Sequence, residues 1–215
     1  MYEDLTDAFY IAKYEAKAEK MAAYMKNKFA YLGIPRPQRD ALQSGFIKEA
    51  RKKDVDWELV IKLWDMPERE FQYLAMDYID SVKKKLKEED LMKIKELIGN
   101  KSWWDTVDFL AAVIVGDLCG RYPGLKLEML LYADSSDIWL KRTAILFQLK
   151  YKDNTDTELL EKILDKCCGT KEFFLNKAIG WALREYSKTD AEWVRRYIQS
   201  RELHSLSIRE GSKYI

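Results

Sequence analysis

The sequence is poor in the residues that most often carry metal or nucleophilic chemistry. Its 215 residues include one histidine, His204, and three cysteines, with no Cys-x-x-Cys pair. One histidine cannot complete the usual zinc spacings and gives Ser-His-Asp or Cys-His catalysis little support. Cys119 stands alone and Cys167 and Cys168 are adjacent, so we expect three reduced bystander thiols. The sequence predicts no metal site, and any catalysis must use carboxylates and aromatic side chains.

Glycine, proline and long apolar runs are also scarce. The nine glycines and four prolines are about half of the ordinary share, which argues against a loop-rich β-sandwich and against disorder. The longest apolar run, residues 109–115, is far shorter than the ~20 residues that span a bilayer. The acidic start has no apolar stretch of a signal peptide. We therefore expect a soluble cytoplasmic chain with no membrane partner.

What the sequence does contain is helical spacing of apolar residues along its whole length. Typical helix-start residues recur, among them Ser102, Asp156 and Asp190, each followed by an apolar-periodic segment. No low-complexity segment or long linker separates two halves. The sequence therefore predicts an all-α protein with a single domain over residues 1–215.

Four segments align as an internal repeat. Each opens with an aromatic residue and follows a shorter amphipathic helix, and their starts are separated by 32, 36 and 34 residues. A period in the mid-thirties with two helices per unit is typical of an α-solenoid, in which the second helices line a concave surface. The aligned segments are residues 70–79, 102–111, 138–147 and 172–181.

One position of this alignment carries an unexpected carboxylate. The seventh position holds Met76, Ala144 and Ala178 in three segments but Asp108 in the remaining one. An unpaired buried carboxylate is costly, so Asp108 should reach an open surface or shift its pKa. Trp104 lies four residues earlier on the same helix face, and together they form a candidate site for a cation. The alternative is a structural Asp paired with a nearby Lys or Arg.

Arg142 interrupts an uncharged pattern at the fifth position, one repeat after Asp108. It should face the same groove, or form a salt bridge with Asp108 or Asp137. Trp181 is either part of the core or a platform for a ligand. Residues 141–215 carry 15 basic and 11 acidic residues, which fits a groove that faces phosphates. The basic residues at second-helix positions are Arg142, Lys150, Lys152, Lys177 and Arg184.

At Lys101-Ser-Trp-Trp-Asp-Thr-Val-Asp108 the sequence resembles the AlkD-type DNA alkylation repair glycosylases, a bacterial family built from HEAT-like helical repeats. The resemblance covers nearly the whole chain, and motifs this long in one order are specific. The other segments that carry it are residues 23–27, 32–34, 63–71, 137–142, 145–152, 171–173 and 177–186.

The resemblance implies an α-solenoid of HEAT-like repeats whose concave groove binds double-stranded DNA. It implies excision of positively charged alkylated purines, N3-methyladenine and N7-methylguanine, in base excision repair, without flipping the base. Trp104, Asp108 and Trp181 match the family's catalytic positions, and Arg142 matches an arginine of the same cleft. Tyr24 lies in a family motif and is a further candidate DNA contact. The resemblance also implies no metal or cofactor, a monomer, and a place in the bacterial cytoplasm with nucleoid DNA.

The chemistry follows from the substrate. An alkylated purine is already a good leaving group, and positive charge moves onto the sugar as the bond breaks. We expect Asp108 to stabilise that charge and activate water, and Arg142 to contact a phosphate. We also expect Asp108→Asn to leave folding intact, since a carboxylate in an open cleft adds little stability. The alternatives are a non-catalytic DNA-binding protein or a protein-interaction scaffold.

Overall fold

The computed structural model describes the backbone of residues 2–215 and the side chains from residue 4 onward. Apart from one β-bridge between Ala30 and Glu68, these residues form helices and loops without a strand, which confirms the all-α class. None of the described helices is long and apolar enough to cross a bilayer. The sequence predicted one domain, and the internal packing divides the chain into two compact units, Met1–Leu86 and Lys87–Ile215.

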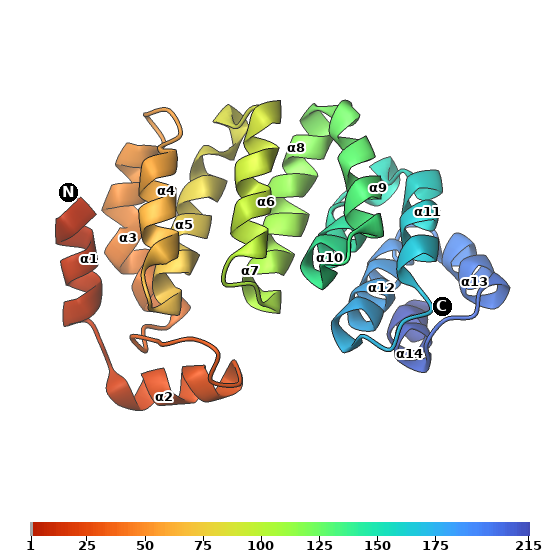
Figure 1. Ribbon diagram of the computed structural model, residues 1–215, viewed down its shortest axis with the longest axis horizontal. Coiled ribbons are helices and arrows are strands. Elements are labelled where there is room, and N and C mark those ends of the chain that lie inside the picture. The colour runs from red at the N-terminus through yellow and green to blue at the C-terminus, as the bar shows by residue number, and fades with distance from the viewer. Residues whose placement is uncertain (1) are drawn as a thin grey trace. The chain divides into compact units, whose positions relative to one another are not determined.

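The first unit is organised around α5, which packs against α3 and α4 (Figure 1), and α1 packs against α3. Its core contains the fully buried Phe9 and Phe71, whose rings stack with centroids 5.5 Å apart. The aromatic residue that opens the first aligned segment is therefore a core residue. The helices of this unit are α1 (Tyr2–Ile11), α2 (Glu15–Tyr24), α3 (Arg36–Ala50), α4 (Trp57–Asp65) and α5 (Arg69–Val82).

A buried carboxylate fixes the loop that leads into α3. Glu70, in the first turn of α5, accepts hydrogen bonds of 2.8 to 3.1 Å from the N–H groups of residues 32–34. Gly33 has φ +85°, and a Cβ at this position would lie 2.2 Å from the carbonyl oxygen of Tyr14. Only glycine fits such a close approach with a positive φ. The three hydrogen bonds tie this loop to α5 and thereby place the first turn of α3.

The second unit has α10 at its centre, in contact with α6, α7, α9, α11 and α12. α13 and α14 pack against α12 (Figure 1). This succession of packed helix pairs is consistent with the predicted α-solenoid. The helices are α6 (Leu91–Gly99), α7 (Trp104–Phe109), α8 (Gly116–Arg121), α9 (Lys126–Asp134), α10 (Ile138–Leu146), α11 (Thr157–Cys167), α12 (Phe173–Tyr186), α13 (Ala191–Ser200) and α14 (Ser205–Gly211).

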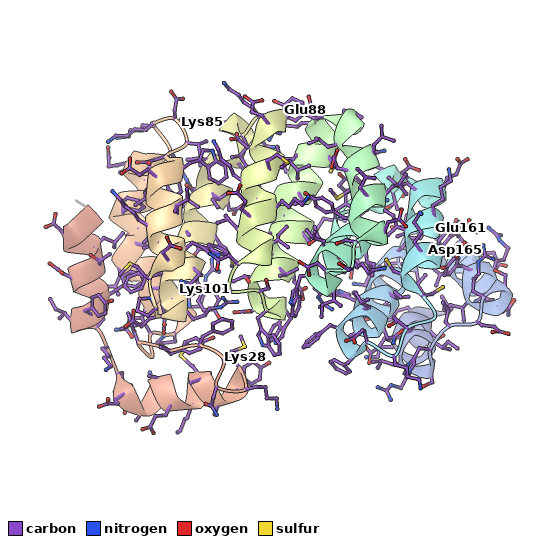
Figure 2. The ribbon with its side chains drawn as sticks, in the orientation of Figure 1. Lys28, Lys85, Glu88, Lys101, Glu161 and Asp165 are labelled. Carbon is purple, nitrogen blue, oxygen red and sulfur yellow. The ribbon has the colours of Figure 1, made fainter. Side chains whose placement is uncertain are left out.

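Ion pairs join α11 to the segment after α13. Glu161 and Asp165 lie one turn apart on α11 (Figure 2). Arg201 donates to Glu161 at 2.5 Å and to Asp165 at 2.9 Å, and the hydroxyl of Tyr197 donates to Asp165 at 2.9 Å. These contacts join the C-terminal helices to α11 within the second unit.

A π-helical segment, Leu110–Val115, joins α7 to α8 in one continuous helix. Gly116 follows it at the point where this helix touches α10: a Cβ there would lie 2.5 Å from the backbone oxygen of Phe147. The hydroxyl of Tyr151 donates to the Gly116 carbonyl at 2.6 Å. Such π segments are wider than an α-helix and often occur at functional sites. Here the segment begins two residues after Asp108.

Gly116→Ala should therefore destabilise the protein. The added methyl group meets backbone that cannot rotate away, so we expect a cost of about 1–3 kcal/mol and a melting temperature about 3–10 °C lower. Gly120→Ala is a matched control on the same helix, because its Cβ would sit at an ordinary 3.6 Å from the Tyr151 hydroxyl. Thermal melts of both variants test this; equal melting temperatures would show that the close approach is unimportant.

Candidate active site

Asp108 lies in α7, one helical turn after the half-buried Trp104. The preceding loop turns sharply, with φ +52° at Lys101, and Trp103 is the N-cap residue. The hydroxyl of Ser102 donates to the Ile98 carbonyl at 2.6 Å and so closes α6. The sequence predicted Ser102 as the N-cap of this helix, and that prediction is wrong by one residue, since the N-cap is Trp103. The Ser102 hydroxyl instead bonds to the end of the preceding helix, α6.

Arg142 of α10 holds the Asp108 carboxylate in a two-pronged ion pair. Nε donates to Oδ1 at 2.6 Å and Nη2 donates to Oδ2 at 2.8 Å. Nη1 donates to the backbone carbonyl of Phe174 in α12. One guanidinium thus joins three helices, a task that its planar fork suits and a lysine could not match.

The ion pair settles one question that the sequence left open. Of the two possible partners of Arg142, the structure pairs it with Asp108. Asp137 instead caps α10, and its carboxylate accepts from the N–H of Trp139 at 2.8 Å. The Arg142 guanidinium is engaged by protein groups on all three nitrogens, so this geometry favours the salt-bridge alternative over the expected phosphate contact.

Three aromatic rings form a cluster, and one of them, Phe174, lies beside Arg142. Trp103, Trp139 and Phe174 come from the starts of α7, α10 and α12, with ring centroids 5.0 to 5.7 Å apart. The Arg142 guanidinium carbon lies 6.0 Å from the Phe174 ring centroid. Neither Trp103 nor Trp139 was singled out as a site residue from the sequence. The sequence did contain a signal for both, because each is the aromatic residue that opens its aligned segment.

The electrostatics of the pair are unequal. The Asp108 side chain is 15% exposed and that of Arg142 is 4% exposed, so Asp108 is the more accessible partner. Burial raises the pKa of Asp108, while the hydrogen bonds and charge of Arg142 oppose that rise. Two oxygens that both accept from one guanidinium describe an ionised carboxylate. The site therefore presents a fixed, partly desolvated negative charge, which can stabilise a cation.

Trp181 lies in α12 and is half-buried. It comes seven residues after Phe174, which is two helical turns on the same face and about 10 Å along the axis. Trp104 and Asp108 share α7. Trp181 belongs to α12, and the Phe174 carbonyl in the first turn of α12 accepts the third hydrogen bond of Arg142.

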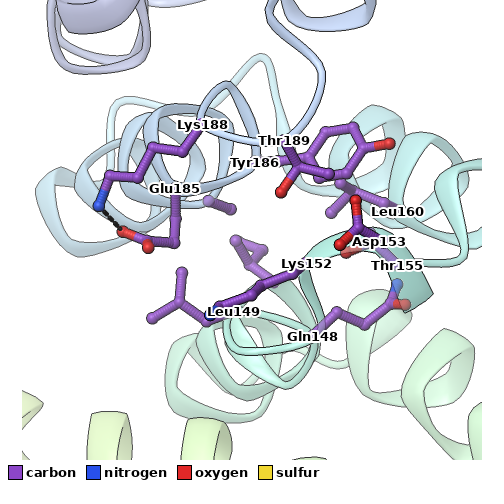
Figure 3. Close-up of a pocket in the computed structure, with 12 residues that line it drawn as sticks. Gln148, Leu149, Lys152, Asp153, Thr155, Leu160, Glu185, Tyr186, Lys188 and Thr189 are labelled. Carbon is purple, nitrogen blue, oxygen red and sulfur yellow. Dashed lines mark hydrogen bonds and ion pairs between the residues drawn. The ribbon is translucent and has the colours of Figure 1, made fainter.

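The two lysines predicted to contact DNA lie beyond the other end of α10. Both Lys150 and Lys152 are exposed. Lys152 lines a pocket of about 510 Å³ at the C-terminal ends of α10 and α12 (Figure 3), together with Gln148 and Glu185. Lys150 lines a second pocket, of about 450 Å³. Neither lysine is brought to Asp108, but both leave their charges open to solvent, as a phosphate contact needs.

The remaining candidate contacts are differently placed. Arg184 donates to Glu210 of α14 at 2.9 Å. Glu210 also pairs with Lys177 and Lys213, and these hydrogen bonds lower its pKa to about 2. Arg184 thus ties α12 to α14. Tyr24, at the end of α2 in the first unit, is 70% exposed.

Comparison with known proteins places this geometry in a family. The family model of DNA alkylation repair enzymes matches residues 5–215. The chain belongs to that family. A solved structure, "Predicted DNA alkylation repair enzyme from Enterococcus faecalis", is similar to this chain, with a TM-score of 0.89 and 34% sequence identity. The match covers 94% of this chain and 96% of that one. No curated protein sequence matches the chain significantly.

Membership of the DNA alkylation repair enzyme family confirms the resemblance that the sequence suggested. The matched residues span both compact units and include every candidate residue of the site. A DNA repair role therefore belongs to the chain as a whole. Among the described residues, no group of three or more histidine, cysteine, aspartate or glutamate side chains is arranged to hold a metal ion.

Proposed function

We propose that this protein is a DNA glycosylase that excises N3- and N7-alkylated purines from duplex DNA. The observation that carries the proposal is the ionised carboxylate of Asp108, which Arg142 fixes and whose side chain is 15% exposed. Its substrates, N3-methyladenine and N7-methylguanine, are cations, and so is the sugar in the transition state. In this proposal the protein acts as a monomer in the bacterial cytoplasm, without a metal or cofactor.

The reaction is hydrolysis of the N-glycosidic bond. The bonding electron pair leaves with the purine nitrogen and neutralises the charge of the base, while the sugar carbon becomes cationic. Asp108 stabilises that carbon electrostatically and accepts a proton from the water that attacks it. The base needs no protonation, so the scarcity of histidine is no obstacle.

The surrounding side chains support this carboxylate. Arg142 acts as a positioning residue, because it fixes both oxygens and protein groups engage all three of its nitrogens. Trp104 and Trp181 offer apolar faces that can hold the sugar and exclude water, which strengthens the effect of a nearby charge. As the family resemblance implies, the base is excised in this proposal without being flipped out of the duplex.

The direct test is an excision assay with purified protein and duplex DNA that contains 7-methylguanine. Release of the free base, above the rate without protein, supports the proposal. A non-catalytic DNA-binding protein would bind the duplex without release, and a protein-interaction scaffold would show no salt-dependent affinity for DNA.

We expect Lys152→Gln to weaken duplex binding mainly at low salt. Each phosphate contact adds about 0.9 to the slope of log affinity against log salt, so losing one should reduce the slope by about that amount. Lys166→Gln is the control, because Lys166 of α11 pairs with Asp134 at 2.8 Å. Filter-binding titrations at several salt concentrations measure both slopes. Equal slopes for the two variants would remove Lys152 from the DNA-binding surface.

A further inference from the structure

The first unit contains a pocket that the proposed chemistry does not use. Its volume is about 380 Å³, within the range of small-ligand sites. Side chains from α2, α3, α5 and the loop after α2 form it, and three of them are tyrosines. The lining residues are Lys20, Met21, Tyr24, Met25, Tyr31, Arg39 and Tyr73.

Arg39 is the unusual member of this set. It is 6% exposed, and its Nε atom is buried without a hydrogen-bond partner among the described residues. The guanidinium carbon lies 4.5 Å from the ring centroid of Tyr73. The carboxylate that influences it most, Asp77, is bonded elsewhere, to Arg36 at 3.1 Å and Gln43 at 2.8 Å.

A buried guanidinium whose Nε–H has no acceptor is costly for a folded protein. Desolvation lowers the pKa of Arg39, yet a guanidinium stays protonated at neutral pH. Most buried polar groups are satisfied, so an exception calls for an explanation. A ligand that brings an anion into the pocket would compensate the charge of this guanidinium and offset part of this cost.

The rest of the pocket indicates which anion. The hydroxyls of Tyr31 and Tyr73, which both line it, lie 3.1 Å apart. Lys20 adds a second cation and Tyr24 a largely exposed ring. A cation beside aromatic faces is the pattern that binds the backbone and bases of single-stranded nucleic acid, since every base can stack on an aromatic ring.

We propose that this pocket binds one unstacked nucleotide of a DNA strand, with its phosphate on Arg39 and Lys20 and its base against Tyr24. The inference rests on the proposed function only in taking DNA as the partner. It assigns the first unit a nucleotide-binding site of its own, separate from Asp108.

The test measures fluorescence anisotropy of a labelled short oligothymidylate with the full-length protein. Arg39→Met keeps a linear side chain about as long as the stem of arginine and removes the charge, and it should weaken binding about tenfold. Lys48→Met is the control, because it removes an exposed charge from the same helix. A base-free oligomer of equal charge should bind as weakly to the wild-type protein as oligothymidylate binds to the variant.

Stability provides a second readout. Because Arg39 lacks a hydrogen-bond partner at Nε, Arg39→Met should leave the melting temperature unchanged or raise it, and loss of binding then reflects the site. Tyr24→Ala, at an exposed position, should weaken binding without a change in melting. The proposal is overturned if Arg39→Met and Lys48→Met bind alike, if Tyr24→Ala binds normally, or if the base-free oligomer binds as well as oligothymidylate. Excision of 7-methylguanine is measured separately, so loss of one claim leaves the other standing.

Discussion

Replacing Asp108 with asparagine should lower the single-turnover rate of 7-methylguanine release about 100- to 1,000-fold, the usual effect of losing one electrostatic stabiliser. Asparagine keeps the size of the side chain but carries no charge and cannot accept the proton of water. Its amide group also turns one N–H donor toward the Arg142 fork, where an acceptor is required. Affinity for duplex DNA should stay equal or rise, because removal of an anion relieves repulsion with phosphates.

The structure changes the expected effect on folding. From the sequence, Asp108→Asn was expected to leave stability intact. In the structure Asp108 is largely buried and paired with an arginine that is buried still more deeply. Removing one partner of a buried pair leaves the other charge uncompensated, which costs about 3 kcal/mol. The variant should therefore melt at a lower temperature while it still folds at 25 °C.

A matched control separates catalysis from stability. Asp117 of α8 pairs with Arg121 at 2.8 Å and is 13% exposed, close to the exposure of Asp108. Asp117→Asn should therefore lose some stability, less than Asp108→Asn because Arg121 is 26% exposed, but it should excise normally. If Asp117→Asn slowed excision as much as Asp108→Asn, the loss would come from the weakened fold and not from the carboxylate.

Arg142→Gln should slow excision at neutral pH by about 10- to 100-fold, an effect comparable to losing a residue that orients a reactive group. Arg142 is the group that opposes the rise in the pKa of Asp108, so its removal leaves burial to raise that pKa further. A smaller fraction of Asp108 is then ionised, and the acid limb of the excision rate moves to higher pH.

The sign of the stability change follows from the same linkage. A carboxyl group whose pKa is higher in the folded protein than in the unfolded chain binds more protons when folded. Arg142→Gln should therefore become more stable, relative to the wild type, as the pH falls through that raised pKa. Excision rates and thermal melts between pH 4 and 8 measure both effects. Arg121→Gln, which breaks the control pair, should leave the pH profile of excision unmoved; a shift as large as that of Arg142→Gln would rule out the positioning role.

Local signals predicted the helices well and the connections between them less well. The four aligned segments fall on α5, α7, α10 and α12, because apolar spacing is set by which face a helix buries. Asp156 and Asp190 cap α11 and α13 as predicted. Ser102 does not cap α7, because its hydroxyl bonds back to the end of α6.

Features that depend on packing between helices had no local signal. The fourth aligned segment opens with Phe173, but it is Phe174 that joins the aromatic cluster with Trp103 and Trp139. The π segment after Asp108 arises where the helix adapts to α10, at Gly116. Neither the choice of Phe174 over Phe173 nor the position of the π segment changes the pattern of apolar residues, so the sequence could not predict either.

The sequence singled out the two charged residues of the candidate site but not their pairing. Asp108 and Arg142 stood out because each is a charged residue at a position of the aligned repeat that is uncharged in the other three segments. The sequence could not choose between Asp108 and Asp137 as the partner of Arg142, because both lie at plausible positions and only the packing of α7 on α10 decides. Arg39 was missed for the same reason, since the lack of a hydrogen-bond partner is a property of the folded surroundings.

The most direct test of the account is the pH dependence of single-turnover 7-methylguanine release by wild-type protein and by Asp108→Asn, measured side by side with the protein-free rate subtracted. The wild-type rate should fall on the acid side as Asp108 takes up a proton, at a pH above the usual range of an aspartate. Asp108→Asn should be slow at every pH and lack this limb. A wild-type-like rate in Asp108→Asn, or the same acid limb in both proteins, would contradict the assignment of Asp108 as the catalytic carboxylate.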